Sequence, residues 1–131
     1  MTRVVMGLLF ESSGLILVAK RDRRKKYGGL WEFPGGKIEG GETVEEALER
    51  EIQEEMSAPV KVLKVHDGYI FSHKGLQAEF IPVAGTIEPE DIILNEHEAF
   101  RFIMTSQLRD FDFSPPDYGA IDLIEKNKEL F

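Results

Sequence analysis

Hydrophobic residues fall into short runs, rich in β-branched side chains, that predict strands in both halves of the chain. The first two runs are separated by Glu11-Ser12-Ser13-Gly14, a polar stretch typical of a hairpin turn. A later pair is separated by residues 71–75, which end in Lys74-Gly75 and predict a second turn. The predicted strands are residues 4–10, 15–19, 60–70, 76–83 and 100–104, with a short extended piece at residues 31–34.

Between the early and the late strands, residues 43–55 predict an amphipathic helix. Thr43 can accept from a free amide of the first turn, and Glu46, three residues later, completes the capping-box pattern. Val44, Leu48 and Ile52 stand four apart, so at about 3.6 residues per turn they form the face that packs on the core. The glycine-rich backbone before this helix predicts a turn.

The last third of the chain predicts a short helix, a loop and a final helix. Residues 105–109 form the short helix, and residues 111–116 form the loop, because two adjacent prolines disfavour a helix there. The final helix is predicted to begin at Asp117, for which an N-cap is the simplest role. Its apolar side consists of Ile121, Leu123, Ile124 and Leu130. This order of elements predicts an α+β fold, in one domain over residues 1–131.

Composition narrows the possible environments and partners. A chain of 131 residues supports one hydrophobic core and is too short for two domains. It has neither a signal-peptide pattern nor an apolar run near the ~20 residues needed to cross a membrane, which favours a soluble cytoplasmic protein. The absence of cysteine excludes disulfides and thiolate chemistry. A net charge of -8 argues against a nucleic-acid polymer as the main partner.

The helix over residues 43–55 carries three acids near its C-terminal end. Glu51, Glu54 and Glu55 are spaced three and four apart, so their carboxylates repel one another where the helix dipole also disfavours negative charge. A solvated acidic face is the simplest interpretation. The alternative is a site for a hard divalent cation, built from these carboxylates and a backbone carbonyl. Arg50 is the only basic residue between Glu39 and Glu55.

The spacing of these residues resembles a known family signature. Gly36, five residues, Glu42, seven residues, Arg50-Glu51-Ile52, one residue and Glu54-Glu55 is similar to the Nudix box. Nudix hydrolases cleave nucleoside diphosphates linked to another moiety. The chain departs at the end of the box, where it has Ser57-Ala58 in place of a glycine and an aliphatic residue. Glycine would leave the helix in a left-handed conformation at little cost, whereas serine costs about 1 kcal/mol.

The resemblance implies the fold, a metal and a set of residues. The implied fold is an α/β/α sandwich with a mixed β-sheet. The implied cofactor is Mg²⁺, with Mn²⁺ as a substitute, and Arg50 would orient a glutamate. The implied metal ligands are Gly35, Glu51, Glu54, Glu55 and Glu96. Glu54 or Glu96 would be the general base. The role of Glu96 follows from a Glu-His pair six residues before an aromatic, here Phe102.

Other positions resemble substrate contacts of MutT-type members. Arg21 would contact substrate phosphate, whereas residues 23–26 are interpreted as a solvated basic loop. Lys37 is a second candidate for substrate binding. Asp117 follows the prolines where related enzymes place an Asn or Asp that reads the base. Trp31 and Phe33 are interpreted as packing groups, and His66 and His73 as structural or exposed.

The sequence therefore predicts a Mg²⁺-dependent nucleoside triphosphate pyrophosphohydrolase that acts on a small-molecule nucleotide, as a monomer or homodimer. Asp117 favours cytidine-type nucleotides such as CTP or 5-methyl-dCTP, or oxidised nucleotides such as 8-oxo-dGTP, as in sanitation of the nucleotide pool. The alternatives are hydrolysis of ADP-ribose or of dinucleoside polyphosphates, removal of RNA caps, and a nucleotide-binding module without catalysis.

Overall fold

The computed structural model describes residues 1–131, which form an eight-stranded mixed sheet, two α-helices and three short 3-10 helices. The strands are β1 (Thr2–Phe10), β2 (Ile16–Lys20), β3 (Trp31–Glu32), β4 (Gly35–Lys37), β5 (Val60–Val65), β6 (Tyr69–His73), β7 (Leu76–Ile87) and β8 (Ala99–Ile103). The α-helices are α1 (Val44–Met56) and α2 (Tyr118–Lys126), and the 3-10 helices are Pro89–Asp91, Thr105–Asp110 and Pro115–Asp117. None of these helices is long and apolar enough to cross a membrane.

Strand β1 lies at the centre of the sheet and determines its mixed character. It pairs in parallel with β7 along its length, and antiparallel with β4 near its start and with β2 at its end. Strands β5 and β6 pair with β7, and strands β3 and β8 pair with β2, all antiparallel. The predicted mixed sheet is confirmed.

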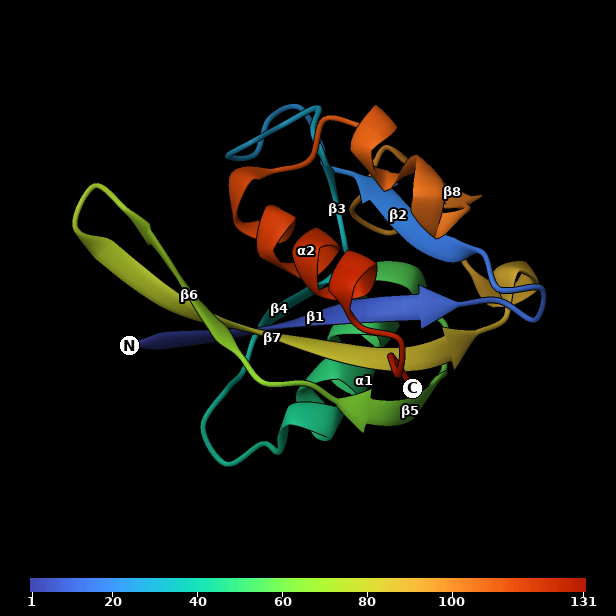
Figure 1. The fold of residues 1–131 in the computed structure, drawn as a ribbon, viewed down its shortest axis with the longest axis horizontal. Coiled ribbons are helices and arrows are strands. Elements are labelled where there is room, and N and C mark those ends of the chain that lie inside the picture. Colours follow the sequence, from blue (N-terminus) through green and yellow to red (C-terminus); the bar gives the residue numbers. More distant parts are fainter.

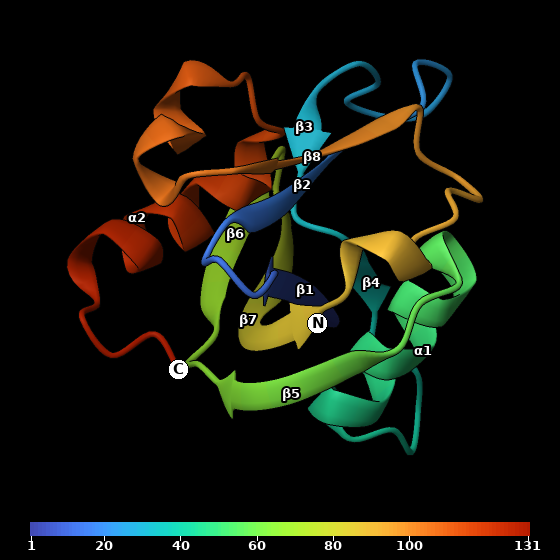
Figure 2. The same cartoon turned by 90° about the vertical axis from the view of Figure 1, so that its right-hand side faces the viewer.

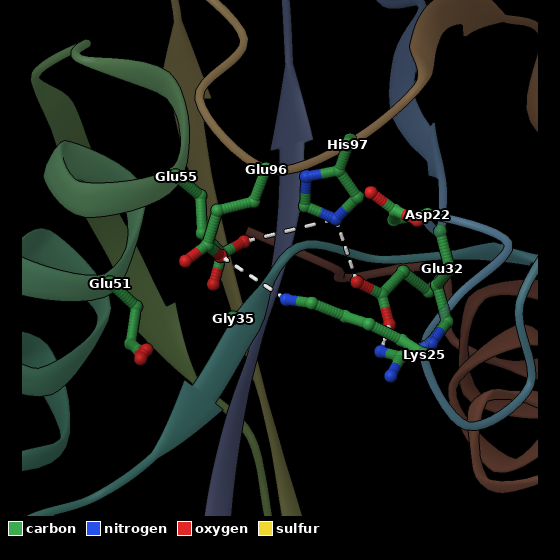
Figure 3. Close-up of a pocket in the computed structure, with 9 residues that line it drawn as sticks. Asp22, Lys25, Glu32, Gly35, Glu51, Glu55, Glu96 and His97 are labelled. Carbon is green, nitrogen blue, oxygen red and sulfur yellow. Dashed lines mark hydrogen bonds and ion pairs between the residues drawn. The ribbon is translucent and has the colours of Figure 1, made fainter.

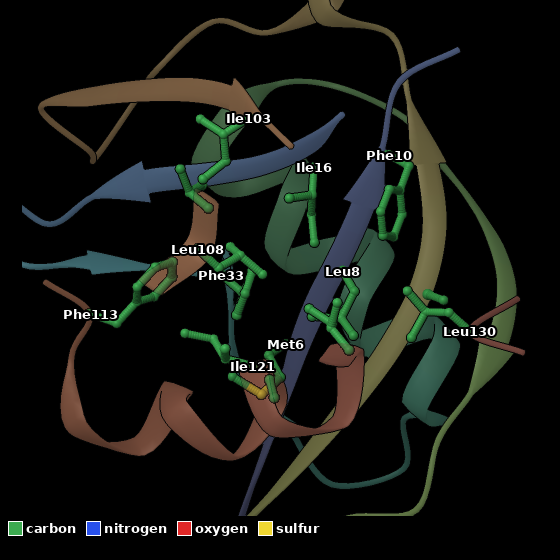
Figure 4. Packing of buried hydrophobic residues seen from close by; sticks show 14 residues of the cluster. Met6, Leu8, Phe10, Ile16, Phe33, Ile103, Leu108, Phe113, Ile121 and Leu130 are labelled. Carbon is green, nitrogen blue, oxygen red and sulfur yellow. The ribbon is translucent and has the colours of Figure 1, made fainter. Parts of the chain in front are cut away.

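The two α-helices cover opposite faces of the sheet, as Figures 1 and 2 show. Successive side chains of a strand point to opposite faces. Met6 and Leu8 of β1 therefore pack with Ile121 of α2 in one core, drawn in Figure 4. Val5 and Leu9 pack with the opposite core, to which α1 contributes Ala47, Leu48, Ile52 and Met56. This arrangement confirms the predicted α/β/α sandwich.

Helix α1 begins and ends with specific caps. The Thr43 hydroxyl accepts from the Glu46 N–H at 3.1 Å, and the Glu46 carboxylate accepts from the Thr43 N–H at 2.9 Å, which confirms the predicted capping box. At the other end, Ser57 adopts the left-handed conformation with φ 52°, although it lacks the freedom of glycine. The departure from the family pattern therefore leaves the path of the chain out of the helix unchanged.

Several predicted elements are corrected. The strand predicted over 60–70 is two strands, because residues 66–68 break the pairing and His66 turns inward to contact the Leu130 carbonyl. The turn predicted over 71–75 is only Lys74-Gly75, both with positive φ, as in the tightest hairpins. The predicted glycine turn after Pro34 contains strand β4.

The predicted loop over 111–116 is also corrected, because its prolines open a 3-10 helix, Pro115–Asp117. Proline is tolerated there because the first residues of a helix need no donor.

Candidate active site

The segment 31–37 crosses from β2 to β1 and brings Glu32 and Gly35 to the same pocket. Strand β3 pairs with β2, whereas β4 pairs with the start of β1. The Gly7 N–H donates to the Pro34 carbonyl at 2.7 Å and fixes the crossing. The Glu32 side chain and Gly35 therefore line the same pocket.

This pocket is strongly polar and has no hydrophobic lining residue. Its volume is about 190 Å³. The acids come from α1, from β3, from the end of β2 and from the loop before β8, as Figure 3 shows. The lining residues are Arg21, Asp22, Lys25, Glu32, Gly35, Glu51, Glu55, Glu96 and His97.

Two of the three predicted acids of α1 point into the pocket. Glu51 and Glu55 lie one turn apart on the helix, and their side chains are only 13% and 6% exposed. A side chain on Gly36 would put its Cβ 2.2 Å from Glu51 Oε2, so only glycine leaves room for this carboxylate. The position of the Glu51 carboxylate therefore requires glycine at position 36.

Burial raises the pKa of the Glu55 carboxyl to about 9, and the nearby charges of Glu32 and Glu51 add to the effect. Burial also raises the pKa of Glu51. Glu55 Oε1 is buried and has no hydrogen-bond partner. A buried carboxylate oxygen without a donor is costly, so this group favours a proton or a cation.

His97 lies against these acids from the loop before β8. Its Nε2 donates to Glu32 Oε2 at 2.7 Å and stands 4.0 Å from Glu55 Oε1. On the other side, Arg21 Nη1 donates to Glu32 Oε1 at 2.6 Å. The Glu32 carboxylate therefore accepts from both the His97 imidazole, in the loop before β8, and the Arg21 guanidinium, directly after β2.

The lining suits a hard divalent cation. Such ions prefer carboxylate and carbonyl oxygens, and Glu51, Glu55, Glu96 and the backbone of Gly35 meet in this pocket. Ligand atoms of Glu32, Glu55 and His97 also lie within 4.8 Å of one another. The unpartnered oxygen of Glu55 fits a cation directly.

Arg50 and Glu54 lie beside the pocket and do not line it. Arg50 Nη2 donates to Glu42 Oε1 at 3.0 Å and to the Lys37 carbonyl at 2.9 Å. Its Nη1 stands 3.4 Å from Glu51 Oε1 and 3.3 Å from Glu54 Oε1. The Glu54 carboxylate is more than half exposed, so the three acids of α1 do not form the single cluster predicted from their spacing.

A second hollow of about 330 Å³ adjoins the acidic pocket and shares Arg21, Glu32 and Gly35 with it. Lys37 lines this hollow with an exposed side chain. Asp117 also lines it and is almost completely buried. The structure thus brings the three predicted substrate contacts, Arg21, Lys37 and Asp117, to one hollow.

Asp117 occupies the N-cap position of α2, as predicted, but its side chain makes no capping hydrogen bond, so the predicted capping role is wrong. Its Oδ2 accepts from the Phe33 N–H at 2.7 Å, and its Oδ1 accepts from Ser114 Oγ at 3.2 Å. Burial raises the pKa of this carboxyl well above its usual value, and the charge of Glu32 adds to the shift. Asp117 therefore ties the start of α2 to the segment after β3.

The packing interpretations hold, and four of the residues that line the pocket had not been predicted as site residues. Phe33 is buried, and Trp31 packs edge-on against Phe111, as predicted. Asp22, Glu32 and His97 had no predicted role, although His97 belongs to the Glu-His pair of the family pattern. Lys25 belonged to the loop interpreted as solvated, but its Nζ lies 3.8 Å from Glu96 Oε2 inside the pocket.

The sandwich fold and an acidic pocket beside basic residues fit a metal-dependent hydrolase of phosphate linkages. The family model described as NUDIX domain matches residues 1–123. The chain therefore belongs to the Nudix family, which confirms the resemblance seen in the sequence.

Two relatives match most of the chain. The Mycobacterium tuberculosis (strain ATCC 25618 / H37Rv) protein named "Putative 8-oxo-dGTP diphosphatase 2" is 37% identical over 123 residues, which cover 90% of this chain and 84% of the relative. The CTP pyrophosphohydrolase of Escherichia coli (strain K12) is 30% identical over 127 residues, covering 90% and 87%.

Among solved structures, the Escherichia coli ORF135 protein has a TM-score of 0.74 and 26% identity, covering 100% of this chain and 95% of that one. The MutT protein from Methanosarcina mazei Go1 has a TM-score of 0.80, with 96% of each chain covered. At 20% identity, this second likeness concerns the fold alone.

Proposed function

We propose that the protein is a divalent-metal-dependent nucleoside triphosphate pyrophosphohydrolase, which converts a nucleoside triphosphate and water into the monophosphate and pyrophosphate. The observation that carries the proposal is the acidic pocket, in which buried carboxylates of α1 meet Glu96 beside Arg21 and Lys25. A triphosphate needs both cation sites and basic side chains, and both kinds of group are present. The names of the two curated relatives support the same reaction type.

Glu51, Glu55, Glu96 and Gly35 would hold Mg²⁺, or Mn²⁺ in its place, and Glu54 is the further proposed ligand at the rim. When bound, the metal supplies positive charge that neutralises the diphosphate. Arg21 lines both hollows and binds phosphate there. Lys37, which lines the adjoining hollow, is the second basic residue that binds the substrate. Whichever of Glu96 and Glu54 is left free of metal would accept the proton of the attacking water; Glu96 lines the pocket, whereas Glu54 does not.

Arg50 has a positioning role in this proposal. Its contacts with Glu42, Glu51 and the Lys37 carbonyl hold one of the metal-binding acids against the glycine segment. It lines neither the acidic pocket nor the adjoining hollow, so it binds no substrate.

The adjoining hollow would take the base, with Asp117 as the recognition group. An ionised carboxylate only accepts hydrogen bonds and suits the amino group of cytosine, whereas a protonated carboxyl also donates, as an oxidised purine requires. The raised pKa of Asp117 favours the protonated form. The protonated form suits 8-oxo-dGTP and the ionised form suits cytidine-type nucleotides, so we propose both as small-molecule substrates in the cytoplasm.

A panel of nucleotides tests this proposal and its rivals together. The panel contains 8-oxo-dGTP, CTP, 5-methyl-dCTP, dCTP and ADP-ribose, each with Mg²⁺, and pyrophosphate and phosphate are measured separately. We expect kcat/KM for 8-oxo-dGTP or a cytidine nucleotide to exceed that for ADP-ribose by about tenfold or more, because a base site discriminates through buried polar groups. The highest kcat/KM for ADP-ribose, or binding without turnover of any nucleotide, would overturn the proposal.

A further inference from the structure

The loop that carries Glu96 and His97 closes the C-terminal end of α1. The last carbonyls of a helix have no partner within the helix. Here the Asn95 N–H donates to the Glu55 carbonyl, and Asn95 Nδ2 donates to the Glu54 carbonyl, both at 2.9 Å. The same Nδ2 donates to Ser57 Oγ at 2.9 Å. Asn95 thus serves as an external cap for the helix that provides the carboxylates.

The other end of the loop is also held. The Glu98 N–H donates to the Lys20 carbonyl at 3.0 Å, and Glu98 Oε1 accepts from Arg23 Nε at 2.9 Å. Glu96 and His97 therefore stand between two anchored residues. Figure 3 shows them facing Glu55 across the pocket.

Ser57 occupies the position where the family pattern has glycine, and its hydroxyl gives Asn95 an acceptor that glycine lacks. Its backbone has φ 52°, a conformation that disfavours residues with a side chain. A serine held there loses stability relative to glycine. Its hydrogen bond to Asn95 is a contact that a glycine could not make.

We propose that Asn95 and Ser57 are positioning residues whose hydrogen bond places Glu96 and His97 opposite Glu51 and Glu55 and so sets the affinity for the divalent cation. The inference rests on the proposed function of the acidic pocket. Groups that orient metal ligands are worth about 10- to 100-fold in affinity in other metal sites. Ser57 thus makes the helix end less stable than glycine would, and its hydrogen bond to Asn95 holds the loop in place.

The variant Ser57→Gly separates this role from a purely structural one. It removes one of the two acceptors of Asn95 Nδ2 and also relieves the left-handed backbone, so stability should rise while the affinity for the cation falls. In chelator, the Tm of the metal-free protein should rise by a few degrees. By calorimetry without nucleotide, the Kd for Mn²⁺ should rise about tenfold.

Three further variants complete the test. Asn95→Ala removes the contacts of Nδ2 with both Ser57 Oγ and the Glu54 carbonyl, so it should raise the Kd for Mn²⁺ about tenfold or more. The double variant should bind no more weakly than Asn95→Ala, because Ser57→Gly then removes no further contact of Asn95. Asn127→Ala is the matched control, since Asn127 ends α2 and its side chain contacts only the Glu129 N–H. Its Kd for Mn²⁺ should equal that of the unaltered protein.

The outcomes distinguish this inference from the proposed function. A Kd for Mn²⁺ that stays within about twofold in both Ser57→Gly and Asn95→Ala would overturn the positioning role and leave the metal site standing. A lower Tm in Ser57→Gly with weaker Mn²⁺ binding would mean that Ser57 is structural. If the unaltered protein bound no Mn²⁺, the metal site and the inference would both fall.

Discussion

Glu55 Oε1 and His97 Nε2 lie 4.0 Å apart in the acidic pocket, although the two residues come from a helix and from a loop beyond three further strands. Both side chains are almost completely buried. Glu32 accepts hydrogen bonds from Arg21 and His97, whereas Glu55 Oε1 has no hydrogen-bond partner. The chemistry of the pocket therefore depends on which cation or proton occupies Glu55.

The first prediction concerns the pH dependence of stability without metal. The folded protein keeps a proton on Glu55 up to about pH 9, whereas the unfolded chain releases it near 4.5. The folded state thus binds more protons, so the free energy of unfolding should fall as pH rises through this range. Glu55→Gln should weaken this fall and be more stable by about 2 kcal/mol at its alkaline end.

Denaturant unfolding in chelator at several pH values checks this prediction. Glu49→Gln is the control, because Glu49 is exposed on the same helix, and its stability should follow the unaltered protein. Mg²⁺ should stabilise the unaltered protein and leave Glu55→Gln unchanged. Parallel pH profiles for the unaltered protein and Glu55→Gln would contradict the account of Glu55.

The second prediction concerns Arg50. Arg50→Ala leaves Glu42 and Glu51 without their partner, so we expect a loss of about 1–3 kcal/mol in stability, weaker Mn²⁺ binding and a lower kcat together. Arg109→Ala is the control, since Arg109 pairs with exposed acids of α2, Asp122 and Glu125, and lines neither hollow of the site. Unchanged Mn²⁺ binding in Arg50→Ala, with only KM affected, would remove the positioning role.

The third prediction assigns substrate binding to Arg21. Arg21→Ala should raise KM for the nucleoside triphosphate about tenfold, with kcat changed by less than about threefold, because a phosphate contact of equal strength in ground and transition states affects binding alone. Arg3→Ala is the matched control, since Arg3 pairs with Glu79 and lines neither the acidic pocket nor the adjoining hollow. A fall in kcat at constant KM would contradict this assignment.

The fourth prediction concerns the base. Asp117→Asn keeps an oxygen that can accept from the Phe33 N–H, but it fixes one donor and one acceptor in place of a titrating carboxyl. The ratio of kcat/KM for CTP to that for 8-oxo-dGTP should change by about tenfold or more. If kcat/KM falls equally for both nucleotides, Asp117 only ties α2 to the segment after β3.

The features predicted from sequence are those that depend on near neighbours in the chain. The capping box of Thr43 and Glu46 and the core face of α1 follow from spacings within one or two turns. The sandwich followed from the family resemblance. The break at residues 66–68 was missed because each side of it is apolar enough to read as one strand.

The missed parts of the site depend on contacts between distant segments. Glu32 and His97 are 65 residues apart, and Asp117 and Phe33 are 84 apart, so no local pattern relates them. From spacing alone, Glu54 was also predicted to lie in one cluster with Glu51 and Glu55. The structure turns it toward Arg50, because Arg50 and Glu54 lie at i and i+4 on the exposed side of α1.

The central claim is that the carboxylates of the acidic pocket support metal-dependent release of pyrophosphate from a nucleoside triphosphate. The most direct test measures pyrophosphate and phosphate from the preferred nucleotide, with Mg²⁺ and with excess chelator, for the unaltered protein and Glu55→Gln. We predict one pyrophosphate and one monophosphate per nucleotide consumed, with no product in chelator and a loss of about 100-fold or more in Glu55→Gln. Phosphate and diphosphate products, or equal turnover in chelator, would contradict the account.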